Sequence, residues 1–364
     1  MIPLFKVRMA DEAPRYVQKV LDSGYVGEGE RVKQFENEFA KLVGAKEVKP
    51  LMVNSCTSAL SLAYHLLNLG PGSSIISSSQ TCAASNMPLL HRGVKIVWAD
   101  VDKYTGLIDV IDVAKKIDST TKAIIAVDWA GQLPDYELLR ELGIPIVEDA
   151  AHSLLATNRG WQTTKDNIGY IAWSFQAIKH LNTGDGGCLL VPPEQYERAK
   201  KLRWFGLDRD KGGFRADQDI AEAGFKYASN DIAAAIGLAN IKDVRLAVEA
   251  HQNNAKFFNQ VFKDLVKVYV PVLENYTEPS WWFYPILLLD GKYMEFISFM
   301  AEKGIQTGKP HRRNDRLSCF KASNAILPNT AFYDSHYCAI PCGSWLSVED
   351  LHKIADAIIE WDKK

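Results

Sequence analysis

Between residues 49 and 192 the chain alternates short apolar runs with helical patterns, and this alternation limits the possible folds more than any other feature of the sequence. The apolar runs are predicted strands at 49–55, 74–79, 94–101, 122–128, 144–150, 170–175 and 187–192. Helical patterns lie between them at 57–69, 83–91, 110–117 and 134–142. Strands that are apolar along their whole length are buried on both faces. The pattern therefore predicts an α/β fold with a mostly parallel central sheet sandwiched by helices.

Two further helical patterns, at 11–22 and 31–43, precede this region, and a different order of elements follows it. A long helix is predicted over 246–264, and after it come strands at 267–273 and 281–290 and helices at 292–303 and 347–362. This order is typical of a smaller α+β domain. We predict a large domain at 1–245, which includes the N-terminal segment, and a small C-terminal domain at 246–364. No linker rich in Pro or Gly separates them, so we expect a continuous helix at the boundary.

The overall charge argues against two classes of partner. With 42 Lys and Arg against 44 Asp and Glu, the 364 residues carry a formal net charge of −2. A chain without a basic field is not expected to bind nucleic acid or an anionic membrane surface. The longest apolar run, 281–289, is too short to span a bilayer, and charges interrupt the N-terminus too early for a signal peptide. We therefore expect a cytoplasmic protein.

The six cysteines form no CxxC pair, which argues against a disulfide framework. The segment HYCAIPC places His336, Cys338 and Cys342 close together. Their spacing matches no standard zinc site. We therefore expect no metal here, and interpret the segment as a short strand that ends at Pro341.

Polar residues follow several predicted strands, at the sheet edge where open α/β folds bind ligands. The segment NSCTSAL follows the first strand and opens a helix, where Cys56, Thr57 and free N–H groups suit a phosphate. Ser and Thr are also ordinary helix caps, so this segment alone leaves both interpretations open. Asp149 ends a later strand, and His152 follows it. Asp149 is either a functional acid or a helix cap. His152 is either a site residue or an ordinary buried histidine.

Lys179 lies in AWSFQAIKHLNTGDGGCLLV, between an apolar run and a glycine-rich turn. Desolvation lowers the pKa of a lysine amine and allows a Schiff base with a carbonyl. Pyridoxal phosphate (PLP) needs an amine for its aldehyde, an acid for its ring nitrogen and a phosphate-binding cup. Lys179, Asp149 and the NSCTSAL segment supply one candidate for each, and Ser174 adds a hydroxyl. A surface lysine is the alternative for Lys179 alone, but the combination favours PLP.

These residues and their surroundings resemble the DegT/StrS type of nucleotide-sugar aminotransferases, which are fold-type I PLP enzymes. The resemblance covers nearly the whole chain. Its first third is carried by IPLFKV, SGYVGEGERVKQFENEFAKLVGAK and NSCTSAL. VWADVDKYTGLID and AVDWAGQLPD follow, and then VEDAAHSL, SFQAIKHLNTGDGG, GFKYASNDIAAAIG and LSVEDLHKIADAI. The lysine segment and the Glu-Asp-Ala-Ala-His segment are the most specific of these.

The resemblance implies a role for each site residue. Lys179 would hold PLP as an imine and later move protons as a general acid and base. Asp149 would pair with the pyridine nitrogen, and His152 would lie near the ring by its phenolic oxygen.

The cofactor phosphate has its own implied contacts. The backbone at Cys56 and the hydroxyls of Thr57 and Ser174 would hold it from one subunit. Lys226, in GFKYASND, would reach it from the partner subunit of a homodimer.

The chain also departs from the family pattern. Cys82 stands where the family usually has an aromatic ring over the cofactor face, and a sulfur packs there with less area. Cys56 replaces a usual glycine in the phosphate cup, and Lys226 and Ala228 stand where Asn and Arg are common. These differences leave open a bulkier substrate above the cofactor.

The implied reaction moves an amino group from an amino acid, with L-glutamate expected, to a nucleotide-linked keto-deoxysugar, for polysaccharide or glycan biosynthesis. Alternatives are a PLP-dependent sugar dehydratase, an inositol-type aminotransferase, or a non-catalytic regulator with the same fold. The resemblance leaves the sugar, the nucleotide and the aminated carbon (C3 or C4) open. Candidate substrate residues are Trp282, His311 and Arg312, and Arg159 and Arg313 are further cations for the diphosphate.

Overall fold

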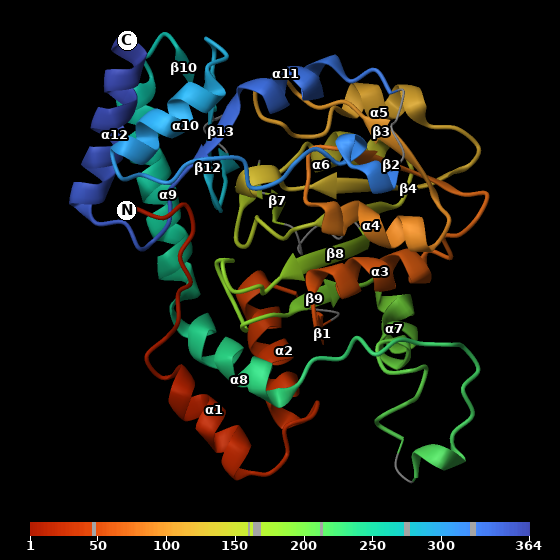
Figure 1. Cartoon of the computed structure of the whole chain (residues 1–364). Coiled ribbons are helices and arrows are strands. Elements are labelled where there is room, and N and C mark those ends of the chain that lie inside the picture. The colour runs from red at the N-terminus through yellow and green to blue at the C-terminus, as the bar shows by residue number, and fades with distance from the viewer. Residues whose placement is uncertain (46–48, 159–160, 163–168, 212–213, 273–276, 321–324) are drawn as a thin grey trace.

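The computed structural model describes residues 1–45, 49–158, 161–162, 169–211, 214–272, 277–320 and 325–364. Its central element is a seven-stranded sheet in the order β1-β9-β8-β5-β4-β2-β3 (Figure 1). The strands are β1 (Leu51–Val53), β2 (Ser74–Ser78), β3 (Lys95–Ala99), β4 (Thr121–Val127), β5 (Ile146–Asp149), β8 (Gly169–Ser174) and β9 (Gly187–Leu190). Strands β3, β2, β4, β5 and β8 are parallel neighbours, and β9 runs antiparallel to both of its neighbours. The predicted mostly parallel sheet is confirmed.

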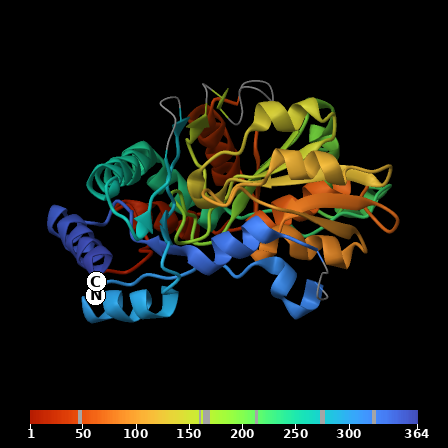
Figure 2. The same ribbon diagram turned by 90° about the horizontal axis from the view of Figure 1, so that it is seen from above.

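Helices cover both faces of this sheet, as Figure 2 shows from above. One face packs against helices through a cluster that includes Phe35, Phe39 and Trp173. These helices are α2 (Glu30–Val43), α5 (Val110–Lys116), α6 (Tyr136–Glu141) and α8 (Asp231–Asn240). The other face packs through Leu60 and Leu62, against α3 (Cys56–Leu66), α4 (Ala83–His91) and α7 (Tyr196–Leu202). Helix α1 (Ala13–Asp22) lies against α8.

A second core belongs mainly to the C-terminal third of the chain. It packs Phe258, Tyr284, Phe296 and Ile358 together, and Ile2 from the N-terminus joins them. The sheet here has the antiparallel order β10-β12-β13. The elements of this C-terminal region are α9 (Val244–Phe262), β10 (Val268–Tyr269), β12 (Tyr284–Leu288), α10 (Tyr293–Glu302), α11 (Pro328–His336), β13 (Tyr337–Ile340) and α12 (Val348–Lys363). A small third sheet has the order β11-β6-β7, from β6 (Thr157–Asn158), β7 (Trp161–Gln162) and β11 (Thr277–Glu278).

The elements agree with the sequence over most of the described chain. The continuous helix expected near residue 245 is α9, and the short strand before Pro341 is β13. The division of the chain at 245/246 stays a prediction. Helices α7, α8 and α11 were not predicted, and α8 shows why. Its sequence DIAAAIGLAN is small and apolar around its whole circumference, because α8 is packed between α1 and α2; such a segment has no polar stripe to reveal its helical period.

Two searches of the described chain bear on membranes and metals. None of its helices is both long and apolar enough to cross a bilayer. In the same residues, no three His, Cys, Asp or Glu side chains are grouped so that they could bind a metal ion.

Candidate active site

The predicted site residues gather at the carboxyl edge of the large sheet. Asp149 is the last residue of β5 and Ser174 is the last residue of β8, and these strands are parallel neighbours. Strand β1 ends at Val53 on the same edge, and α3 begins three residues later at Cys56. Lys179 lies in the connection from β8 to β9, where its backbone N–H donates to Gln176 O at 2.8 Å.

Asp149 is buried beside a hydroxyl that was not predicted from the sequence. Ser85 Oγ donates to Asp149 Oδ2 at 2.6 Å, and Ala151 N donates to Oδ1 at 3.2 Å. Burial raises the pKa of Asp149, while these two hydrogen bonds and the positive charge of Lys179 act in the lowering direction. The carboxylate is thus oriented by two donors and remains able to accept a further proton donor. Cys56 Sγ is a weak neighbour at 4.0 Å from Oδ1.

The amine of Lys179 lies in the same buried space. Burial lowers its pKa to about 8, against the raising effects of Asp149, Cys82 and Cys56. A lysine with this pKa is partly neutral near pH 8, which a nucleophilic amine requires. The Lys179 Nζ lies 3.3 Å from the centre of the Trp282 ring.

Two histidines lie beside this amine. The ring of His152 is stacked on Trp282, with centroids 4.1 Å apart and planes 23° apart, and His311 lies 6.0 Å from both rings. Burial, followed by the charge of Lys179, lowers the pKa of His152 well below its usual value and that of His311 to about 4. Both rings are therefore neutral at physiological pH. His152 Nδ1 and His311 Nε2 are buried and have no hydrogen-bond partner within the described residues.

The start of α3 has the form of an anion site. Ser55 caps the helix by accepting from Ser58 N at 3.1 Å. The first N–H groups of a helix have no partner inside it, so those of Cys56 and Thr57 point outward. Gly187 of β9 lets the strand approach closely, because a Cβ there would lie 2.7 Å from Cys56 N. The cup is therefore formed by backbone atoms.

This set of groups fits PLP. A buried amine of lowered pKa, a buried carboxylate with a free lone pair and a helix N-terminus lie at one sheet edge. The unpartnered His152 Nδ1 adds a polar atom for a ring substituent. Cys82 directly precedes α4, and burial raises the pKa of its thiol, so its sulfur is neutral.

Several predicted residues lie elsewhere or are already paired. Arg313 is buried and bidentate to Asp315, at 2.7 and 2.8 Å, so its charge is neutralised within the chain. Arg312 is exposed. The Lys226 ammonium lies 3.6 Å from the centre of the Trp204 ring of its own chain. Arg159 is outside the described residues.

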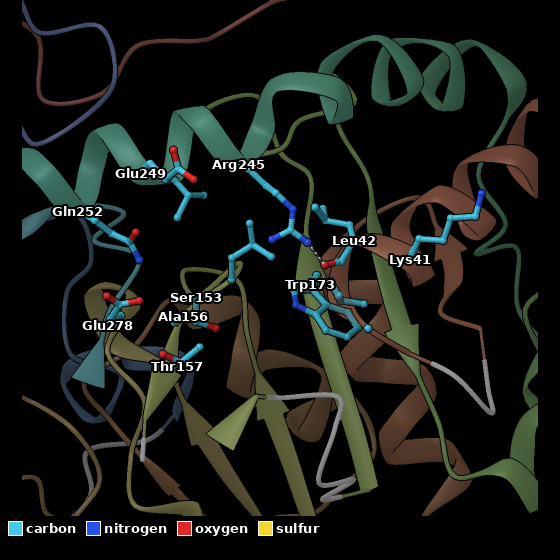
Figure 3. Close-up of a pocket in the computed structure, with 14 residues that line it drawn as sticks. Lys41, Leu42, Ser153, Ala156, Thr157, Trp173, Arg245, Glu249, Gln252 and Glu278 are labelled. Carbon is cyan, nitrogen blue, oxygen red and sulfur yellow. Dashed lines mark hydrogen bonds between the residues drawn. The ribbon is translucent and has the colours of Figure 1, made fainter. Parts of the chain in front are cut away.

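Figure 3 shows a cavity of about 360 Å³ that is separate from these residues. It lies between α9, the end of α2 and β8, and Arg245 reaches across it to donate to Leu42 O at 2.9 Å. Its lining includes Trp173, Thr157 and Ser153 but no predicted site residue. The chemistry predicted from the sequence therefore belongs to the sheet edge and not to this cavity.

The sequence matches the model of the DegT/DnrJ/EryC1/StrS aminotransferase family over residues 7–359. It is 32% identical to the spore coat polysaccharide biosynthesis protein SpsC of Bacillus subtilis, over 94% of this chain and 92% of that protein. The family resemblance inferred from the sequence is thus confirmed.

Solved structures give the same result. The sugar aminotransferase CalS13 from Micromonospora echinospora is 31% identical and superimposes with a TM-score of 0.93, over 99% of this chain and 100% of CalS13. AtS13 from Actinomadura melliaura is 33% identical with a TM-score of 0.94, over 99% of this chain and 98% of AtS13. The predicted fold-type I architecture is confirmed.

Proposed function

Because the chain belongs to the DegT/DnrJ/EryC1/StrS aminotransferase family, it is a PLP-dependent sugar aminotransferase, and we propose that it transfers an amino group from L-glutamate to a nucleotide-linked keto-deoxysugar. The observation that carries this proposal is the placement of Lys179 and Asp149 in one buried space at the sheet edge. The product would be an amino sugar for polysaccharide or glycan biosynthesis. We also propose a cytoplasmic location, as expected from the sequence.

Lys179 is proposed to hold the cofactor through its Nζ and to move protons between substrate carbon and nitrogen atoms. When bound, PLP supplies the electron sink that both half-reactions need. Burial that lowers the pKa of Lys179 to about 8 makes this amine able to accept and return a proton near neutral pH.

Asp149 is proposed to keep the ring nitrogen protonated. Ser85 and Ala151 occupy part of its hydrogen-bonding capacity and orient it. His152, whose Nδ1 has no partner in the described chain, is proposed to bind the phenolic oxygen. Cys82 is proposed to pack against the ring face in place of an aromatic residue.

The phosphate is proposed to bind at the start of α3, through the backbone at Cys56 and the hydroxyls of Thr57 and Ser174. In a homodimer, Lys226 would come from the partner subunit. The Lys226 side chain is exposed in the single chain, where its ammonium lies over the Trp204 ring, and this exposure supports the assignment.

The sugar nucleotide is proposed to enter above the cofactor, where Trp282, His311 and Arg312 were expected to contact it. His311 Nε2 is buried without a partner in the described residues and is the best placed donor among them. Arg312 is exposed and would meet the diphosphate, which a guanidinium binds through two parallel hydrogen bonds.

The test of this function loads the enzyme with amino groups from glutamate and then offers acceptors separately. Keto-sugar nucleotides should restore the cofactor's original absorbance and give an amino sugar detected by mass. If pyruvate or oxaloacetate restores the absorbance as well as any keto-sugar nucleotide does, the enzyme is a general amino-acid transaminase. Loss of a hydroxyl without gain of nitrogen would show a dehydratase, and no colour change with any donor would favour a non-catalytic protein.

A further inference from the structure

The amine of Lys179 has an aromatic partner from the C-terminal third of the chain. Its Nζ lies 3.3 Å from the centre of the Trp282 ring. No carboxylate forms an ion pair with this amine in the part of the chain that the structure describes. The π face of Trp282 is therefore the closest stabilising contact for a positive charge on Lys179.

Trp282 is held rigidly in this place. Its backbone N–H donates to Ala130 O at 3.0 Å, and the residue is 3% exposed. Phe5 stacks on it with centroids 4.5 Å apart and planes 19° apart, and His152 stacks at 4.1 Å. The hydrogen bond and the two ring contacts together fix the position of the indole.

The same indole also contacts the main chain next to the lysine. Trp282 Nε1 donates to Ile178 O at 2.9 Å, and Ile178 directly precedes Lys179. One side chain thus orients the peptide that carries the lysine and lies against the amine at its far end.

We propose that Trp282 is a positioning residue for Lys179, and that its π face binds the amine whenever the lysine is not attached to the cofactor. This inference rests on the proposed function, in which Lys179 carries the cofactor. It assigns Trp282 the role of positioning the lysine, whereas the sequence suggested only a contact with substrate.

The contact has a consequence for ionisation. An aromatic face attracts an ammonium ion but not a neutral amine, so Trp282 favours the charged form and opposes the burial that lowers the pKa of Lys179. Several other groups interact electrostatically with this amine, and they come from different elements. They are Asp149, Cys56, Cys82, His152, His180 and His311. None of them is itself substituted in a variant of Trp282, although the His152 ring loses its stacking partner.

The test measures the ionisation of Lys179 directly in the holoenzyme. Glutamate first converts the bound cofactor to its aminated form, which frees the lysine. Acrylonitrile then alkylates neutral amines, and the extent at Lys179 is measured by peptide mass at a series of pH values. Trp282→Leu keeps the site apolar but removes the π face, so the midpoint of alkylation should fall by about one pH unit, a tenfold change in the ionisation constant.

Trp282→Phe is the second variant, because it retains a smaller π face and should shift the midpoint in the same direction by less. It also carries the test if Trp282→Leu loses the cofactor. Trp98→Phe controls for the loss of an indole. Trp98 is a buried residue of β3 that packs on Phe320, so its substitution should leave the midpoint unchanged.

An unchanged or raised midpoint in both Trp282 variants would overturn the inference. That result differs from failure of the proposed function, in which glutamate would free no lysine in the unaltered enzyme. A purely structural role for Trp282 would lower thermal stability and rates at every pH without moving the midpoint.

Discussion

The carboxyl groups of Asp128 and Glu148 interact with each other, and both side chains are completely buried. Tyr136 OH donates to Asp128 Oδ1 at 2.5 Å and Ser153 Oγ donates to Oδ2. Asp128 N also donates to Asp149 O at 3.1 Å. Two carboxyl groups in contact cannot both be charged in such a place. The pair therefore holds a proton in the folded protein, next to Asp149, which follows Glu148 in β5.

This pair predicts a pH dependence of stability. Burial raises the pKa of Asp128 from its usual value to about 7. Between about pH 4 and pH 7 the folded protein then binds more protons than the unfolded chain, so the free energy of unfolding should fall as the pH rises. The slope would be at most about 1.4 kcal/mol per pH unit for one proton. Urea unfolding at a series of pH values measures it.

Asp128→Asn should flatten this slope, at a pH-independent loss of about 1–3 kcal/mol because an amide cannot accept every donor of the carboxylate. Asp264→Asn, on an exposed residue, should leave the slope unchanged. An equal slope in the Asp128 variant would show that Asp128 is not the group that binds this proton.

Asp149→Asn tests the acid of the site. The amide retains one oxygen for Ser85 or Ala151, so the fold should survive with a small change in melting temperature. It cannot pair with a protonated ring nitrogen, and the half-reaction with glutamate should slow by about 10²–10⁴-fold, the usual range for loss of a positioned acid or base. Stopped-flow absorbance of the cofactor gives the rate. Near-normal rates would contradict the role of Asp149.

Ser85→Ala removes the hydroxyl that donates to Asp149 Oδ2 at 2.6 Å. This hydrogen bond lowers the pKa of Asp149, so its loss should raise that pKa further. Asp149 would then stay protonated up to a higher pH. The acid limb of the rate against pH should move to higher pH. Ser85→Thr retains a hydroxyl, so its acid limb should lie where that of the unaltered enzyme does. An acid limb that does not move in Ser85→Ala would show that Ser85 does not affect the reaction.

A mixed dimer tests the partner contribution of Lys226. Lys179→Ala and Lys226→Ala chains are each expected to be inactive as homodimers. Mixing them should create one complete site in each mixed dimer, because one chain supplies Lys179 and the other supplies Lys226. Activity and bound cofactor after mixing measure this. If mixing restores nothing, each chain completes its own site.

The sequence was sufficient to predict the sheet edge and its main groups, because each group follows its own strand within a few residues. Asp149 and Ser174 end apolar runs, and Cys56 starts the helix after one. The local pattern carries that information, and the order of strands then brings the ends together.

Contacts between distant segments could not be predicted in this way. Trp282 reaches Lys179 from the connection between β11 and β12, and no periodicity links the two. Ser85 did leave a signal. It lies three residues after Cys82 in the first turn of α4, and residues at that spacing share a helix face. A residue one turn after a site cysteine was therefore a candidate for the same space.

The most direct test of the account is to find which lysine carries the cofactor. Borohydride reduces the link between the enzyme and PLP to a stable one, and peptide mapping by mass then locates the pyridoxyl group. We predict that it lies on the peptide that contains Lys179, and that Lys179→Ala shows no label after the same treatment. A pyridoxyl group on any other lysine, with Lys179 unlabelled, would contradict the account.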